Sequence, residues 1–167
     1  MSNLVSAGIL LFRRRGGRLE VLLGHPGGPF WERRNVGSWT IPKGLADPDE
    51  NLEAVAAREF AEETGFELSS VARDPTQPPI PLGEVTLKSR KVIHAWAVEG
   101  DLDPDLARSN EFELEWPPRS GQRMVVPEVD RVAWLEVDEA RRLANPTQAE
   151  LVDRLEAALD RRHAGSP

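Results

Sequence analysis

The chain has 167 residues, of which 40% are hydrophobic and 29% charged, a balance that suits one globular domain with a hydrophobic core. Its formal net charge of −7 argues against broad binding to nucleic acid or to an anionic membrane, but leaves room for a nucleotide in a local basic pocket. Because the sequence has no cysteine, disulfides, thiolate zinc sites and cysteine nucleophiles are excluded.

Two strands are predicted at the start of the chain. The apolar run from Leu4 to Phe12 is too short to cross a bilayer, and a cluster of arginines follows it instead of preceding it as in a secretory signal. We therefore expect no membrane partner and a cytoplasmic location. Leu19 to Gly24 reads as a second strand, which could form a hairpin with the first across Gly16-Gly17.

Residues 25–37 form a predicted loop that is rich in glycine, proline and arginine. Trp31 lies beside Arg33 and Arg34, so this loop could stack a base and hold a phosphate. These three residues are therefore candidates for substrate binding. The alternative is a surface loop in which Phe30 and Trp31 cover the core.

A helix with clear end signals is predicted between Asp47 and Gly65. Asp47 is a good N-cap, Pro48 suits the first helical position, and Glu50 lies three residues after the cap, as in a capping box. Gly65 can end the helix in a left-handed conformation. Lys43, just before this helix, could meet a substrate phosphate or simply be a solvated lysine.

One face of this helix begins apolar and then becomes acidic. Its members are Leu52, Val55, Ala56, Glu59, Glu62 and Glu63. Like charges at this spacing destabilise an isolated helix by roughly 0.2–0.5 kcal/mol per pair, and a divalent cation would offset that repulsion. Clustered oxygen ligands suit Mg²⁺ or Mn²⁺. The alternative is a solvated acidic face on which Arg58 pairs with nearby acids.

Strands 82–87 and 91–98 are predicted after a proline-rich loop, joined by a short basic turn. The cations of this turn are Lys88, Arg90 and Lys91. They could reach substrate phosphates, and a charged hairpin tip that discourages edge pairing explains them equally well.

Residues 100–121 form a long acidic segment that we expect to be mostly loop. Phe112, Leu114 and Trp116 alternate, so a short strand is possible and disorder is disfavoured. The segment could shape substrate specificity or form a contact in a homodimer.

The remaining elements are a strand over 131–137, a short helix over 138–144 and a last helix over 147–162. Thr147 and Glu150 have the spacing of a capping box that opens this last helix. Leu151, Leu155 and Leu159 lie on one face, so we expect the helix to pack on a sheet.

The stretch from Gly44 to Phe66 matches the Nudix box, GX5EX7REUXEEXGU, where U is a large aliphatic or aromatic residue. The matching residues are Gly44, Glu50, Arg58, Glu59, Phe60, Glu62, Glu63, Gly65 and Phe66. The chain therefore resembles the Nudix hydrolases, which cleave a nucleoside diphosphate linked to another group. The 100–121 insert resembles that of a bacterial Nudix subgroup without a settled substrate.

The resemblance implies roles for five acidic and basic residues. Glu59, Glu62 and Glu63 correspond to the metal-binding carboxylates, and one of them could also help to activate water. Arg58 corresponds to a residue that orients them through ion pairs. An acid outside the box often completes the metal site or acts as a base in this family, and Glu128 is our candidate.

The implied fold is α/β, an α/β/α sandwich with a mixed sheet that forms a single Nudix domain over residues 1–167. Besides the loop residues named above, Lys43, Gly44 and Lys91 are substrate-binding candidates, with Gly44 also allowing the chain to turn.

The implied reaction is hydrolysis of a phosphoanhydride bond that depends on Mg²⁺ (or Mn²⁺). Nucleoside triphosphates and dinucleoside polyphosphates are the favoured substrates, with ADP-ribose or a nucleotide sugar as the alternative. A nucleotide-sensing Nudix domain without activity is a second alternative, although such domains often lose box glutamates. A structural protein with an acidic helix is a third, and it would bind no metal.

Overall fold

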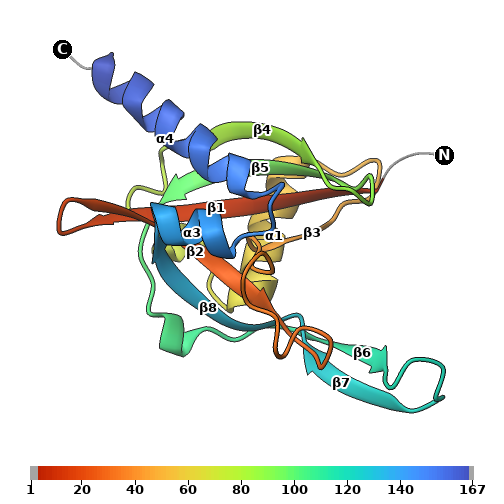
Figure 1. Cartoon of the computed structure of the whole chain (residues 1–167). Coiled ribbons are helices and arrows are strands. Elements are labelled where there is room, and N and C mark those ends of the chain that lie inside the picture. The colour runs from red at the N-terminus through yellow and green to blue at the C-terminus, as the bar shows by residue number, and fades with distance from the viewer. Residues whose placement is uncertain (1–3, 166–167) are drawn as a thin grey trace.

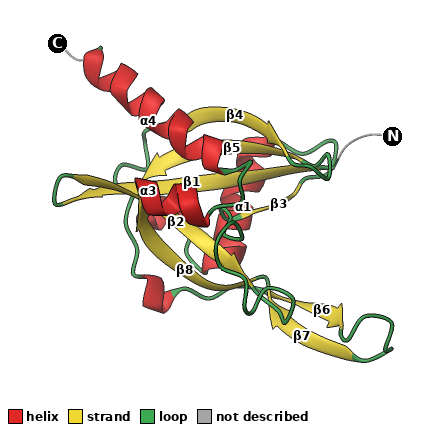
Figure 2. Cartoon of the chain, viewed as in Figure 1, coloured by secondary structure: helices red, strands yellow, loops and turns green. Residues whose placement is uncertain are grey.

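The computed structural model describes residues 4–165 as a mixed sheet with helices on both faces (Figures 1 and 2). The sheet strands are β1 (Val5–Arg15), β2 (Arg18–Pro26), β3 (Lys43–Leu45), β4 (Ile80–Thr86), β5 (Val92–Glu99) and β8 (Val129–Glu136). Their order is β4-β5-β1-β2-β8, with β3 paired to β1. Only β1 and β5 are parallel among these pairs, so the sheet is mixed as predicted.

The central strand β1 supplies side chains to both faces of the sheet. Ala7, Ile9 and Leu11 pack in the core under α1 (Leu52–Thr64), whereas Leu10 and Phe12 pack in the core under the C-terminal helices. This alternation follows from the two-residue repeat of a strand. Both faces are therefore buried, and the predicted α/β/α sandwich is confirmed.

The N-terminal hairpin is confirmed and is longer than predicted. Pairing continues to Arg15 and Arg18, so the basic cluster belongs to β1 instead of ending it. Arg13 can lie in a strand because its guanidinium pairs with Glu20 at 2.7 Å and covers the ring of Trp134 at 4.2 Å.

The predicted start of the box helix is wrong. The N-cap of α1 is Asn51, whose side chain accepts a hydrogen bond from the Ala54 N–H at 2.9 Å. Asp47 instead begins a turn in which its N–H donates to the Glu50 carboxylate at 2.9 Å. Asparagine is as good a cap as aspartate. Since Ala46 still hydrogen-bonds to β1, the helix begins only after the chain has left the sheet.

The 100–121 segment is more regular than predicted. After a short 3₁₀ turn, η1 (Pro104–Leu106), the chain forms a hairpin of β6 (Glu111–Glu115) and β7 (Arg123–Pro127), which projects from the body of the fold (Figure 1). The predicted short strand is confirmed as β6, and β7 lies beyond the predicted loop. Phe112 faces Val126 and Leu114 faces Met124 across the hairpin, so apolar pairs hold it together.

The short helix α2 (Leu68–Val71) precedes β4, and the C-terminal helices are α3 (Val137–Leu143) and α4 (Ala149–Ala164). The capping box predicted at Thr147 is wrong, because the N-cap is Gln148 and its side chain makes no cap hydrogen bond. That side chain is buried and accepts from the Ile41 N–H at 2.9 Å. Leu151 and Leu155 pack in the core as expected. No helix within residues 4–165 is long and apolar enough to cross a membrane.

Gly65 ends α1 in the left-handed conformation, with a φ of 79°, as predicted. A Cβ added there would also lie 2.8 Å from the Arg108 carbonyl oxygen. Gly17 has nearly the same φ, 78°, but open space around it. We predict that Gly65→Ala lowers the free energy of unfolding by more than the ~1 kcal/mol expected for Gly17→Ala, which pays only the left-handed backbone cost.

Thermal and urea denaturation of the two variants would test this prediction. Equal losses of unfolding free energy in the two variants would mean that the Arg108 backbone does not restrict a side chain at Gly65.

Candidate active site

A cavity of about 370 Å³ lies beside the C-terminal half of α1. Four chain segments bring charged side chains to it: β3, α1, the turn before β5 and the residue just before β8. These side chains are Lys43, Glu59, Glu62, Glu63, Lys91 and Glu128. The structure thus brings together the box carboxylates, the candidate acid outside the box and two of the candidate substrate-binding lysines.

Gly44 also lines the cavity, and its role differs from the one predicted. It lies in β3 opposite Ala7 of β1, so it does not make a turn. A Cβ at this position would overlap the carboxylate of Glu59. Glycine is therefore needed because the Glu59 carboxylate lies directly against the backbone of β3.

Three of the four carboxylates in the cavity are held in an environment that opposes their charge. Glu63 accepts a hydrogen bond from the Lys43 backbone N–H at 3.2 Å, yet burial raises its pKa to about 8. Burial and repulsion from Glu62 raise the pKa of Glu59. Burial also raises the pKa of Glu128, although Lys43 acts in the opposite direction. The cavity therefore opposes the ionised form of Glu59, Glu63 and Glu128.

Arg58 lies outside the cavity and braces α1 from the side. Its guanidinium pairs with Glu50 at 2.6 Å and lies 3.6 Å from a Glu59 carboxylate oxygen. The hydrogen bond from Arg58 lowers the pKa of Glu50. Glu50 thus pairs with Arg58, and Arg58 also lies within ion-pair distance of Glu59.

The donor set fits a hard divalent cation. Within residues 4–165 no three acidic or histidine side chains converge on one point, so the carboxylates share the cavity without forming a closed cluster. All of them offer oxygen, the donor that Mg²⁺ and Mn²⁺ prefer. Burial raises the pKa of Glu59 and Glu63, and a bound cation would stabilise their ionised forms. Glu59, Glu62 and Glu63 are the residues that would hold it.

The structure does not bring Trp31, Arg33 and Arg34 into this cavity. Arg34 instead lies 4.3 Å over the Phe30 ring, and Phe30 makes an edge contact with Trp31 at 4.9 Å. Phe30 is 49% exposed and neither aromatic joins a core cluster, so the alternative that they cover the core is also wrong. Arg33 and Arg34 are exposed, and Trp31 is half-buried.

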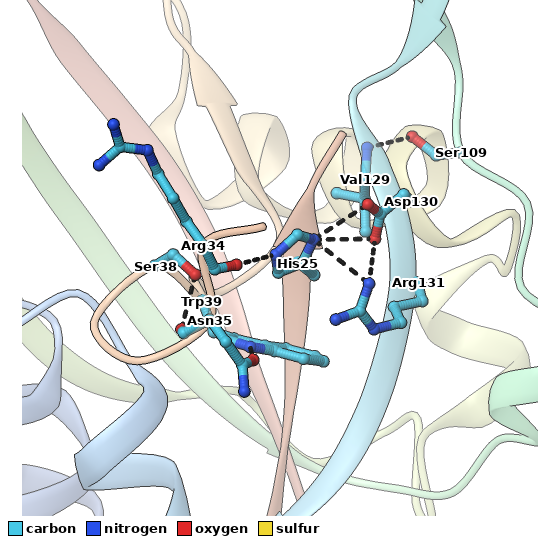
Figure 3. A network of polar contacts seen from close by, with 9 residues as sticks. All are labelled: His25, Arg34, Asn35, Ser38, Trp39, Ser109, Val129, Asp130 and Arg131. Atoms are coloured by element: carbon cyan, nitrogen blue, oxygen red, sulfur yellow. Dashed lines mark hydrogen bonds and ion pairs between the residues drawn. The ribbon is translucent and has the colours of Figure 1, made fainter. Parts of the chain in front are cut away.

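A buried network of hydrogen bonds around His25, which the sequence does not predict, lies at the end of β2 (Figure 3). His25, at the end of β2, is fully buried between two acceptors. Its Nδ1 lies 3.0 Å from both carboxylate oxygens of Asp130, and its Nε2 lies 2.6 Å from the Arg34 carbonyl oxygen. This network fixes the 26–37 loop to the start of β8. No sequence signal could reveal it, because Asp130 lies 105 residues from His25.

Asn110 is a second residue that the sequence did not single out. It lies in the predicted insert, yet it lines the cavity beside Glu128. The length of the insert was the only sign of a functional role.

The buried carboxylates predict an unusual pH dependence of stability for the metal-free protein. The folded state holds a proton on Glu63 up to a pH of about 8, whereas a glutamate in the unfolded chain releases its proton near its ordinary pKa of 4.5. The proton on Glu63 therefore makes a contribution to the free energy of unfolding. This contribution is fully present below pH 4.5 and is lost as the pH rises to about 8. We predict that Glu63→Gln flattens the profile in this window.

Urea denaturation in a chelator, from about pH 5 to about pH 8.5, would check the profile. Glu53→Gln is the matched control, because Glu53 is exposed in the first turn of the same helix. If the free energy of unfolding of Glu63→Gln depended on pH as steeply as that of the wild-type protein, Glu63 would not be the group that holds the proton.

Several solved structures share this fold. A C. elegans Ap4A hydrolase binary complex superposes with a TM-score of 0.64 at 20% identity, covering 93% of this chain and 98% of that one. The NUDIX domain of Shewanella oneidensis NrtR complexed with ADP ribose gives 0.62 at 19% identity, with 95% and 90% covered. A mutT/nudix family protein from Listeria innocua gives 0.62 at 17% identity, with 99% of both chains covered.

The sequence comparison agrees with the fold. No curated protein matches the chain. The family model of the NUDIX domain, however, matches residues 2–155, which is nearly the whole sequence. With a complete box motif and its carboxylates gathered in one cavity, the chain belongs to the Nudix family.

Proposed function

We propose that this protein hydrolyses a phosphoanhydride bond of a nucleoside triphosphate or a dinucleoside polyphosphate, with Mg²⁺ or Mn²⁺ as cofactor. The observation that carries the proposal is the grouping of four carboxylates and two lysines around one cavity. Carboxylates alone would repel a polyphosphate, so the arrangement makes chemical sense only with a cation between protein and substrate.

The roles of the residues follow from their positions. A divalent cation held by Glu59, Glu62 and Glu63 would neutralise phosphate oxygens and lower the pKa of a bound water. Glu128 faces the same cavity with a raised pKa, which suits a general base that takes a proton from the attacking water. Lys43 would hold phosphate oxygens that do not react.

The shared fold does not distinguish between substrates, since it includes both an Ap4A hydrolase and an ADP-ribose-bound domain. The charges around the cavity favour a longer phosphate chain. The turn between β4 and β5 carries Lys88, Arg90 and Lys91, and Lys91 lines the cavity. None of the three makes an ion pair or side-chain hydrogen bond within residues 4–165. They would extend the phosphate-binding surface beyond Lys43.

The backbone of this turn supports a functional role for Arg90. Its φ is 71°, in the left-handed region where glycine is usual and other residues cost about 1 kcal/mol. Strain of this kind is often found at functional sites. The guanidinium of Arg90 could bind a third or fourth phosphate of the substrate, which would explain why arginine occupies this strained position. ADP-ribose and nucleotide sugars lack such a phosphate.

Glu62→Gln should lower kcat by roughly 100-fold or more, because the site loses a carboxylate needed for the cation and for activating water. The assay would use the purified protein with Mg²⁺ against ATP, diadenosine tetraphosphate, ADP-ribose and a nucleotide sugar, with products resolved by chromatography.

Glu53→Gln on the exposed face of α1 is the control, and both variants should keep the wild-type melting temperature. Turnover near the wild-type value in Glu62→Gln would show that the carboxylate cavity is not the active site. Absence of turnover by the wild-type protein on every substrate would instead favour a nucleotide-sensing role.

The effect of Arg90 on substrate binding can be separated from its effect on fold stability. Arg90→Gly should raise KM for ATP roughly two- to fivefold, the range of a solvent-exposed ion pair. The same change should raise the free energy of unfolding by up to about 1 kcal/mol, because glycine relieves the left-handed backbone.

Arg119→Gly is the matched control, since Arg119 also has a positive φ, 63°, and lies in the turn of the projecting hairpin. It should gain stability without any change in KM. The substrate assignment fails if Arg90→Gly leaves KM for ATP unchanged, or if it raises KM for ADP-ribose equally.

A further inference from the structure

The projecting hairpin has its base in the active-site cavity. β6 begins directly after Asn110 and β7 ends directly before Glu128, and both of these flanking residues line the cavity. The Glu128 N–H donates to the Asn110 carbonyl oxygen at 2.9 Å. The hairpin therefore closes on the residue that we assign as general base.

The segment that leads into the hairpin is joined to the end of the carboxylate helix. The Asn110 N–H donates to the Glu62 carbonyl oxygen at 2.8 Å, and the Arg108 N–H donates to the Thr64 carbonyl oxygen at 2.8 Å. These bonds satisfy carbonyl groups that the last turn of α1 would otherwise leave unpaired. Residues 108–110 thus connect the backbone at Glu62 to the backbone at Glu128.

Ser109 supplies the side-chain link in this connection (Figure 3). Its hydroxyl donates to the Asn110 carbonyl oxygen at 2.9 Å and accepts from the Val129 N–H at 3.0 Å. On the other side, the Gly27 N–H donates to the Glu128 carbonyl oxygen at 3.1 Å. The backbone around Glu128 is therefore held by two separate segments of the chain.

The carboxylate of Glu128 is free by contrast. It makes no hydrogen bond and no ion pair within residues 4–165, although it lines the cavity. A fixed backbone with a free carboxylate is what a general base needs if it must meet a proton on a bound substrate or water.

We propose that Ser109 is a positioning residue that holds Glu128 against the carboxylate end of α1, through the hydrogen bond from the Val129 N–H. This inference rests on the proposed function, because it requires Glu128 to act in the reaction. A shift of about 1 Å in a reacting group can cost roughly 100-fold in rate. The hydroxyl of Ser109 therefore affects the chemical step without touching the substrate.

The test is turnover of Ser109→Ala on ATP or diadenosine tetraphosphate, whichever the wild-type protein hydrolyses faster. We expect kcat to fall roughly 10- to 100-fold with KM within about twofold, since substrate contacts are unchanged. Ser109→Thr, which keeps the hydroxyl, should restore most of the rate. If Ser109→Ala does not fold, Ser109→Cys provides a weaker acceptor of similar size for the same measurement.

Ser120 offers a matched control at the far end of the same hairpin. Its hydroxyl also donates to a carbonyl, that of Pro117 at 2.6 Å, and also accepts an N–H, that of Gln122 at 3.1 Å. Ser120→Ala removes the same pair of bonds away from the cavity and should leave kcat unchanged. A similar fall in Ser120→Ala would mean that general loosening of the hairpin, and not the position of Glu128, lowers the rate.

A double-mutant cycle with Glu128→Gln isolates the route of the effect. If Ser109 acts through Glu128, Ser109→Ala should lower kcat in the wild-type background and have no further effect in Glu128→Gln. Equal effects in both backgrounds would overturn the proposal, and so would wild-type turnover in Glu128→Gln. Neither result would affect the role of Glu62, so this failure is distinguishable from failure of the proposed function.

Discussion

The feature on which the rest of the site depends is negative charge placed where the fold opposes it. Glu62 and Glu63 lie in the last turns of α1, where the helix dipole is negative and no basic residue offsets it. Burial opposes the ionised form of Glu59 and Glu63 as well. The ionised carboxylates are therefore unfavourable in the protein alone, and a bound cation would stabilise them.

Other parts of the site are arranged around this charge. Gly44 lets the Glu59 carboxylate lie against β3, and Arg58, anchored by Glu50, holds the same carboxylate from outside. Gly65 ends the helix beside Arg108, so that residues 108–110 can run past its last carbonyl groups. The box motif thus encodes the support of the carboxylates as much as the carboxylates themselves.

Local signals in the sequence predicted much of the fold and about half of the site. The apolar run that forms β1, the end of α1 at Gly65 and the carboxylates of α1 all depend on near neighbours in the chain. The N-cap was missed because Asp47 and Asn51 are equally good caps, and the choice between them depends on pairing between β3 and β1.

The contributions of Asn110, Ser109 and His25 could not be predicted, since each depends on a partner far away in the sequence. Asn110 meets Glu62 through the backbone, and backbone hydrogen bonds leave little trace in residue type. His25 meets Asp130 only because β2 and β8 are neighbours in the sheet. The loop residues Trp31, Arg33 and Arg34 have suitable chemistry for a nucleotide, but chemistry alone did not place them at the cavity.

The most direct test of the account is calorimetric titration of the protein with Mn²⁺ at about pH 7, in two buffers that differ in ionisation enthalpy. Because burial raises the pKa of Glu63 to about 8, binding at this carboxylate must displace its proton. We predict release of about one proton per bound ion, with affinity reduced roughly tenfold or more in Glu59→Gln. Binding with no proton release, or unchanged binding in Glu59→Gln, would contradict a cation site built from the carboxylates of α1.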